Sequence, residues 1–307
     1  MESETLFASA PVPPTRAGLG VDGCRAGWFW ISLTDSEAAF GVVAGFRECL
    51  GVVDSETRIL VDIPIGLPSG AEYPRECDAL ARRTLGRPRG SSVFNVPGRE
   101  ALETTDVEEA REVSRRLSGV AFSNQLWAIQ PKILEVDRVL RADPAARTRV
   151  RETHPELAFW ALNDDEPVIE PKKSRDGFER RLSILSRFDS RAEQLVEDAL
   201  TEFPRTSVQR DDIVDAFVCA LIARSPGLRT VPADPPRDEF GLPMEMCIPA
   251  ELPVSIEGDA FRETASDVDS PGPVLSHRFE RAVTLARRWH SGQSRKARTG
   301  TQSKSER

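Results

Sequence analysis

AGLGVDGCRAGW (residues 17–28) contains an apolar run that ends at Asp22-Gly23, with further glycines on both sides. An apolar run closed by turn residues predicts a strand that presents the Asp22 carboxylate at its end. Asp-Gly is also ordinary turn chemistry, so a functional meaning for Asp22 depends on other acids in the chain. The run WFWISL begins at Trp28, which predicts a second strand directly after a tight turn.

Five apolar runs predict one mixed five-stranded sheet. GLGVDG, WFWISL and AAFGVV all lie within residues 18–43, and their short connections make them antiparallel neighbours. Residues 59–63 form a fourth strand that is apolar except for Asp62, and residues 147–162 read as a fifth strand that enters a helix. Because a strand apolar on both faces is usually central, we expect an α/β fold with flanking helices and with strands four and five parallel to strand one.

Helical periodicity fills most of the remaining chain. Two helical stretches, 74–85 and 105–141, form a helical insertion after the fourth strand, over about residues 68–145. Gly119 and Pro131 are expected to break the second stretch. Further helices are predicted over residues 171–188, 190–203 and 211–225. The last of them is apolar nearly all round, which is typical of a buried helix.

The two ends of the chain differ in composition from its centre. Residues 1–16 are polar and Pro-rich, and we expect a mobile leader. The domain should span residues 17–250, with irregular chain from Pro232, and residues 251–307 form an acidic and then basic tail that we expect to be disordered. Residues 276–307 carry nine Lys or Arg and two Glu, a net +7, whereas the whole chain carries −8, which leaves −15 on the rest. The tail either folds back on the acidic body or gathers nucleic acid for it.

Cysteine and histidine content limits the chemistry. The five cysteines are an odd number without a CxxC pair, and the chain has three histidines. These counts argue against a disulfide framework and a zinc site, and they indicate reduced thiols in the cytoplasm. The N-terminus has acids where a signal peptide needs bases, and no apolar run reaches membrane-spanning length. We therefore expect a cytoplasmic protein without a membrane partner.

Acidic residues interrupt two apolar segments. Asp62 ends the fourth strand, where Asp-Ile-Pro is also a common turn formula. Asp215 lies inside the apolar helix 211–225, where an unpaired carboxylate costs several kcal/mol or shifts its pKa. Asp211 or Asp212 could cap this helix, yet Asp212 and Asp215 share one face at i, i+3 spacing. Two acids that converge in a core call for a cation.

Glu156 has two interpretations. Thr153-His154-Pro155-Glu156 fits a capping box in which Thr153 is the cap and Glu156 reaches back to it. In the other interpretation, Glu156 is an additional acid of the site. We expect His154 to be packed or hydrogen-bonded rather than to bind a metal.

The order of these segments resembles known proteins. Two apolar strands that each end in Asp, followed by a late helix with D-x-x-D-A, are similar to the ribonuclease H-like fold of nucleases and Holliday-junction resolvases. The closer resemblance is to a family of predicted nucleases, the domain of unknown function DUF429. It is carried by GVDGCRAGW, DIPIGLP, RECDALARRTLGRPRGSSVF, THPE and DDIVDAFVCAL, over roughly residues 18–230.

The resemblance implies a catalytic metal site made of aspartates. Asp22 would be the acid of the first strand, Asp62 that of the fourth strand, and Asp212 and Asp215 the acids of the helix. Phosphodiester hydrolysis by such a set uses two hard cations about 4 Å apart. Carboxylates suit Mg²⁺ or Mn²⁺. Asp22, on the central strand, would be best placed to bridge both ions.

A basic segment follows the fourth strand. Residues 75–99 contain six arginines and the sequence SSVF. A solvated charged face and a phosphate-binding surface explain these arginines equally well. The candidates for binding substrate phosphate are Arg89, Ser91, Ser92, Lys172 and Lys173.

Together these features predict a metal-dependent nuclease or phosphodiesterase that acts on a nucleic acid or nucleotide. One alternative is a phosphotransferase of the actin or sugar-kinase type, which shares the core of the fold and places an Asp-Gly turn near phosphates. The chain is short for two such domains, and its sequence shows no second Gly-rich phosphate loop. The other alternative is a binding module that keeps the acids only as structure, and such a dead site should not bind Mn²⁺.

Overall fold

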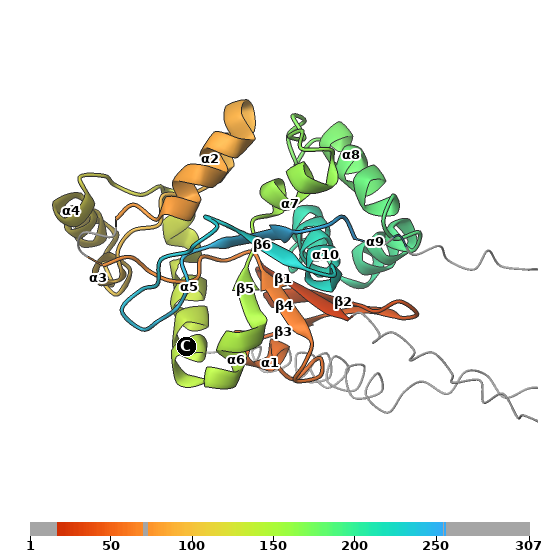
Figure 1. The fold of residues 1–307 in the computed structure, drawn as a ribbon, viewed down its shortest axis with the longest axis horizontal. Helices are drawn as coiled ribbons and strands as arrows, with labels where there is room; N and C mark the ends of the chain where they lie inside the picture. The colour runs from red at the N-terminus through yellow and green to blue at the C-terminus, as the bar shows by residue number, and fades with distance from the viewer. Residues whose placement is uncertain (1–16, 70–72, 254, 256–307) are drawn as a thin grey trace, which may run out of the picture.

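The protein contains the five-stranded sheet that the sequence predicts (Figure 1). A computed structural model describes residues 17–69, 73–253 and 255. The strands are β1 (Gly18–Cys24), β2 (Gly27–Leu33), β3 (Ala38–Val43), β4 (Arg58–Val61) and β5 (Val150–Glu152), in the order β3-β2-β1-β4-β5. β2 pairs antiparallel with both β1 and β3, whereas β4 is parallel to β1 and β5 is parallel to β4. This is the ribonuclease H-like topology, and it confirms the predicted α/β fold.

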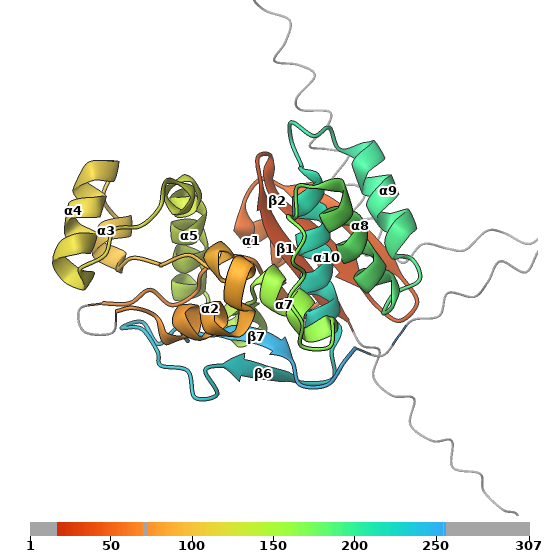
Figure 2. The same ribbon diagram turned by 90° about the horizontal axis from the view of Figure 1, so that it is seen from above.

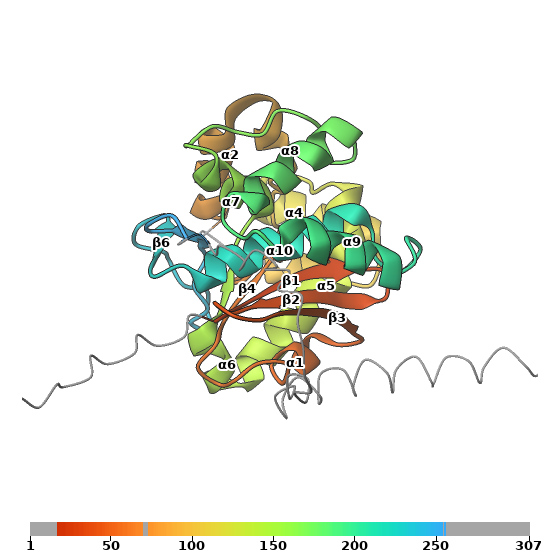
Figure 3. The same cartoon turned by 90° about the vertical axis from the view of Figure 1, so that its right-hand side faces the viewer.

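Helices cover both faces of the sheet (Figure 3). The helices are α1 (Phe46–Cys49), α2 (Glu76–Arg89), α3 (Arg99–Leu102), α4 (Val107–Ser118), α5 (Asn124–Ala142), α6 (Pro144–Arg149), α7 (Pro155–Leu162), α8 (Arg175–Ser186), α9 (Ala192–Glu202) and α10 (Arg210–Arg224), with a 3-10 turn η2 (Gly90–Ser92). α8, α9 and α10 lie over one face, and α1 and α6 lie below the other. α3 and α4 lie beyond α5, away from the sheet (Figure 2).

Alternation along β2 divides the apolar core between the two faces. Trp28 and Trp30 pack in one core with Phe46 of α1 and with α5. Phe29 and Ile31 point the other way, into the core that contains α10. Successive side chains of a strand point to opposite faces, so one apolar strand serves both layers.

Glycines of β1 allow α10 to lie directly on the sheet. A Cβ atom added at Gly20 would be 2.0 Å from the Ala216 carbonyl oxygen and 2.2 Å from the Ala220 nitrogen. Gly18 makes the same kind of approach to the end of α10. The helix is buried nearly all round, as its apolar sequence predicts. This close contact brings the first turns of α10 beside the end of β1.

Two sequence-based helix breaks are tested by the structure. Gly119 ends α4 in the left-handed conformation (φ 74°), as expected for a helix-terminating glycine. Pro131, in contrast, lies inside the uninterrupted helix α5, so the predicted break there is wrong. Buried side chains before and after it, including Leu126 and Ile133, pack in the core and keep the helix in place.

The chain after Pro232 is irregular as expected up to residue 245, and then forms one strand. A second sheet pairs β6 (Leu228–Val231) with β7 (Met246–Pro249), and every residue of β7 is buried. Asp238, between the two strands, forms an ion pair with Arg99 at 2.7 Å and accepts a hydrogen bond from the Leu67 N–H. The leader and the tail beyond residue 255 lie outside the described residues.

The structure also bears on the expectations about the cysteines and about membrane-spanning segments. All five cysteines are free thiols with buried side chains. Within the part of the chain that the structure describes, no helix is long and apolar enough to cross a membrane.

Candidate metal centre

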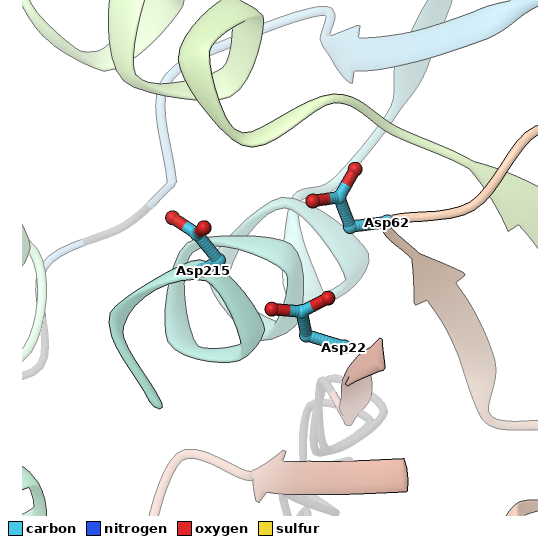
Figure 4. A group of neighbouring side chains, drawn as sticks. All are labelled: Asp22, Asp62 and Asp215. Carbon is cyan, nitrogen blue, oxygen red and sulfur yellow. The ribbon is translucent and has the colours of Figure 1, made fainter. Parts of the chain in front are cut away.

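Three aspartates far apart in sequence meet at one edge of the sheet (Figure 4). Asp22 lies near the end of β1, Asp62 directly follows β4, and Asp215 lies on α10. One carboxylate oxygen from each lies within 4.8 Å of the other two. The carboxyl ends of the parallel strands β1 and β4 coincide, and the Asp62 N–H donates to the Val21 carbonyl at 3.0 Å. We call this group the aspartate triad.

The environment of the triad disfavours negative charge. Burial, and then repulsion from neighbouring acids, raises the pKa of Asp22 well above its ordinary value. Burial also raises the pKa values of Asp62 and Asp215 to about 6, while the nearby Lys172 ammonium lowers both. Three carboxylates in this position need positive charge nearby to remain ionised.

The donor set fits a hard cation. Asp62 has no hydrogen bond from any side chain or N–H of the described residues, and Asp22 receives one, from the Gly23 N–H at 2.6 Å. Most other buried acids among the described residues differ because they pair with an arginine, as Glu156 does with Arg181, whereas Asp212 accepts the Gln209 N–H. Carboxylate oxygens held close together without arginine partners are the ligands that Mg²⁺, Mn²⁺ and Ca²⁺ prefer.

Lys172 contacts the triad directly. Its Nζ lies 2.8 Å from Asp215 Oδ2 and 3.7 Å from Asp211 Oδ2. The Asp215 carboxylate is the main cause that raises the pKa of Lys172. The sequence predicted Lys172 as a phosphate contact, but its ammonium is bound to a carboxylate of the site. Lys173, the next residue, has an exposed side chain.

Asp212 is near the triad but does not belong to the group that could hold one ion. Its Oδ2 accepts a hydrogen bond of 2.7 Å from the Gln209 N–H, at the start of α10. Asp212 therefore has a capping role, but as the third helical residue reaching back to the N-cap Gln209 and not as the N-cap residue itself. Burial raises its pKa to about 7, and its charge contributes to the raised pKa of Asp22.

Glu156 is neither a capping-box acid nor a member of the triad. α7 begins at Pro155 with His154 as its cap residue, so the interpretation with Thr153 as cap is wrong. The Glu156 carboxylate instead receives two hydrogen bonds, of 2.7 and 2.8 Å, from the Arg181 guanidinium on α8. Both bonds come from one nitrogen, Arg181 Nη2, and this buried ion pair joins α7 to α8, a long-range contact that replaces the local cap.

The predicted phosphate-binding loop makes mostly local contacts. The hydroxyls of Ser91 and Ser92 donate to the carbonyls of Pro88 and Arg89, and Arg89 Nη2 donates to the Ile169 carbonyl at 3.2 Å. The loop also contacts His154, whose pKa is affected by charges of the site. His154 Nε2 is 3.4 Å from the Ser92 carbonyl, and Lys172 and Asp215 both affect the pKa of His154, which burial lowers.

Two of the six arginines between residues 75 and 99 are structural, which neither interpretation of that segment anticipated. Arg75 is fully buried and pairs with Glu152 at 2.6 Å and with Asp78 at 3.4 Å. Arg99 is buried between Asp137 and Asp238. Glu152 also accepts the Ile65 N–H, and so fixes the chain that follows Asp62.

Arg181, which holds Glu156 next to the site, could have been recognised from the sequence. Arg181 shares a face of α8 with the buried residues Gly177, Ile184 and Leu185. An arginine on the apolar face of a helix indicates a buried acidic partner. That partner is Glu156, although the helical pattern does not say which acid it is.

Replacement of Asp62 by asparagine should stabilise the metal-free protein. The pKa of the Asp62 carboxyl is raised from 3.8 to about 6, so its ionisation destabilises the folded state above about pH 6. Below about pH 4 the carboxyl is protonated in both the folded and the unfolded state, and this destabilisation disappears. Because Asp62 is half-buried, we expect a gain of about 1–2 kcal/mol at pH 7.5. Thermal unfolding in EDTA checks this, and a gain that persists undiminished at pH 4 would contradict the electrostatic cause.

The fold and the triad define an α/β protein with a ribonuclease H-like sheet and a carboxylate cluster that could hold a metal ion. The chain belongs to the family described as "Protein of unknown function (DUF429)", which it matches over residues 20–237. No curated protein and no solved structure matches the chain.

Proposed function

We propose that the protein is a divalent-metal-dependent nuclease or phosphodiesterase that uses Mg²⁺ or Mn²⁺. The observation that carries this proposal is the convergence of Asp22, Asp62 and Asp215 at one edge of the ribonuclease H-like sheet. The three come from β1, from the chain after β4 and from α10, so the fold itself assembles the group.

The residues of the site have separate roles in this proposal. Asp22, Asp62 and Asp215 hold the cofactor, which when bound activates water and neutralises charge on the phosphate. The resemblance implied two ions, for which Asp212 was the fourth expected ligand. Glu156 and Arg181 hold α7 and α8 together next to the site.

A nucleic acid or nucleotide is the proposed substrate. The body of the protein is acidic, so a polyanion needs local positive charge to approach. Exposed Arg83 and Arg87 of α2 provide such charge on the element that carries the SSVF loop. Arg89, Ser91, Ser92 and Lys173 remain proposed contacts to its phosphates.

Two other functions would give different results in the experiments described below. A phosphotransferase should hydrolyse or transfer the terminal phosphate of a nucleotide and leave oligonucleotides intact. A binding module should not bind Mn²⁺. The described residues contain one five-stranded sheet, whereas the actin type of phosphotransferase is built from two domains of this kind.

An assay with Asp215→Asn tests the proposal. The purified chain, incubated with single- and double-stranded DNA and RNA in Mn²⁺ or Mg²⁺, should cleave at least one of them, and EDTA should stop the reaction. Asp215→Asn should lower the rate at least about 100-fold because it removes a ligand. Asp198→Asn, an exposed acid on α9, is the matched control and should keep the wild-type rate. Equal rates for all three chains would assign the cleavage to a contaminant or to another site.

A further inference from the structure

Lys172 has a fixed position in the metal centre. Its ammonium lies on Asp215 at 2.8 Å, and the side chain is 40% exposed, so one end meets the triad while part of it remains open to solvent. A surface lysine usually explores many rotamers and contributes little to an ion pair. Here the partner carboxylate is buried, which makes the contact energetically important.

The backbone around Lys172 is held from two sides. Arg181, the partner of Glu156, donates to the Glu170 carbonyl at 3.1 Å. Arg210, in the first turn of α10, donates to the carbonyls of Lys173 and Ser174 at 3.1 and 3.2 Å. The chain that carries Lys172 is therefore attached both to α8 and to the helix that carries Asp215.

Two contacts disfavour the binding of a second ion at this site. Asp212, the expected fourth ligand, is engaged with the Gln209 N–H. Asp215 Oδ2 already has the Lys172 ammonium at 2.8 Å. An ammonium at that distance occupies the space in which a second cation would contact the same oxygen.

We propose that this site takes one divalent ion, and that the Lys172 ammonium serves as its second cation. The inference rests on the proposed function, since it concerns the same hydrolysis of a phosphodiester. One N–H of Lys172 is directed to Asp215, and the ammonium has further N–H groups to donate to a phosphate oxygen. Lys172 would then bind the substrate phosphate while it remains paired with Asp215.

Mn²⁺ titration followed by calorimetry tests this role with the full-length chain. The wild type should bind one Mn²⁺ at the site, and Lys172→Met should bind it at least about tenfold more tightly, because a neighbouring positive charge is lost. Lys172→Arg keeps the charge and should retain an affinity near that of the wild type. Arg229→Met is the control, because it removes one positive charge from an exposed residue of β6 outside the site, and should leave the affinity unchanged.

The rate of phosphodiester hydrolysis distinguishes two roles for Lys172. In one role its ammonium binds the substrate phosphate as a second cation, and in the other it only competes with the metal ion. With bis(4-nitrophenyl) phosphate at saturating Mn²⁺, Lys172→Met should be at least about tenfold slower than the wild type although it binds the ion more tightly. A faster Lys172→Met enzyme would mean that Lys172 only blocks the site, and would overturn the proposal.

The remaining outcomes distinguish this inference from the proposed function. Two ions of similar affinity in the wild type, or an unchanged affinity in Lys172→Met, would overturn the role of Lys172 and leave the nuclease proposal standing. A chain that binds no Mn²⁺, or binds it and hydrolyses no phosphodiester, would overturn both.

Discussion

Addition of Mn²⁺ at about 100 times its dissociation constant should raise the Tm by about 5–10 °C, and Asp22→Asn should remove this gain. A ligand that binds only the folded state at that excess contributes about 2.7 kcal/mol. For a domain of this size, 1 kcal/mol corresponds to about 2–4 °C. Asp22 lies near the end of β1, and its oxygen belongs to the group that could hold the ion.

The gain is measured for each variant against its own Tm in EDTA, by differential scanning calorimetry. This reference is necessary because loss of the Asp22 charge also relieves repulsion from Asp62, Asp212 and Asp215, which raises the stability of the metal-free variant. Asp198→Asn should keep the full gain. A variant Asp22→Asn that gains as much from Mn²⁺ as the wild type would exclude Asp22 as a ligand.

Gly20→Ala should lower the free energy of unfolding by about 3 kcal/mol or more. The added methyl group would lie 2.0 Å from the Ala216 carbonyl oxygen and 2.2 Å from the Ala220 nitrogen, both backbone atoms of α10. Rotation of a side chain cannot relieve such contacts, so the helix must move away from β1. The move would also separate Asp215 from Asp22, so the variant should lose part of its stabilisation by Mn²⁺.

Gly51→Ala provides the matched comparison for urea or thermal unfolding. A Cβ atom at Gly51 has its nearest neighbour, the Glu48 carbonyl oxygen, at 3.6 Å, an ordinary van der Waals distance. Its effect should be within about 0.5 kcal/mol, as for most surface substitutions. Similar stability of Gly20→Ala and Gly51→Ala would show that α10 does not pack on β1 as described.

The sequence contains enough information to predict the sheet and the triad, because both depend on patterns that act over short distances. Apolar runs and short turns determine strands β1 to β3, and an acid at the end of an apolar strand stands out in Asp22 and Asp62. Asp215 is recognisable because it interrupts a helix that is otherwise apolar. Strand order brings these separate signals to the same edge.

The roles of Asp212, Glu156 and Lys172 depend on partners that the sequence does not identify. The Asp212 side chain can turn toward the triad or toward the Gln209 N–H. Its sequence spacing from Asp215 is the same in either case, so the spacing does not decide between them. Glu156 fits a local capping box, but Arg181, 25 residues away, provides a stronger charge-assisted pair. Which of these contacts forms is decided by tertiary packing, and a pattern along one chain does not record it.

Anomalous diffraction from crystals of the protein soaked in Mn²⁺ tests the metal centre most directly. We predict an anomalous peak in contact with carboxylate oxygens of Asp22, Asp62 and Asp215, and no such peak in crystals of Asp22→Asn. A soaked crystal in which Mn²⁺ is bound elsewhere, or in which the three carboxylates have no ion between them at saturating Mn²⁺, would contradict the assignment of this triad as a metal site.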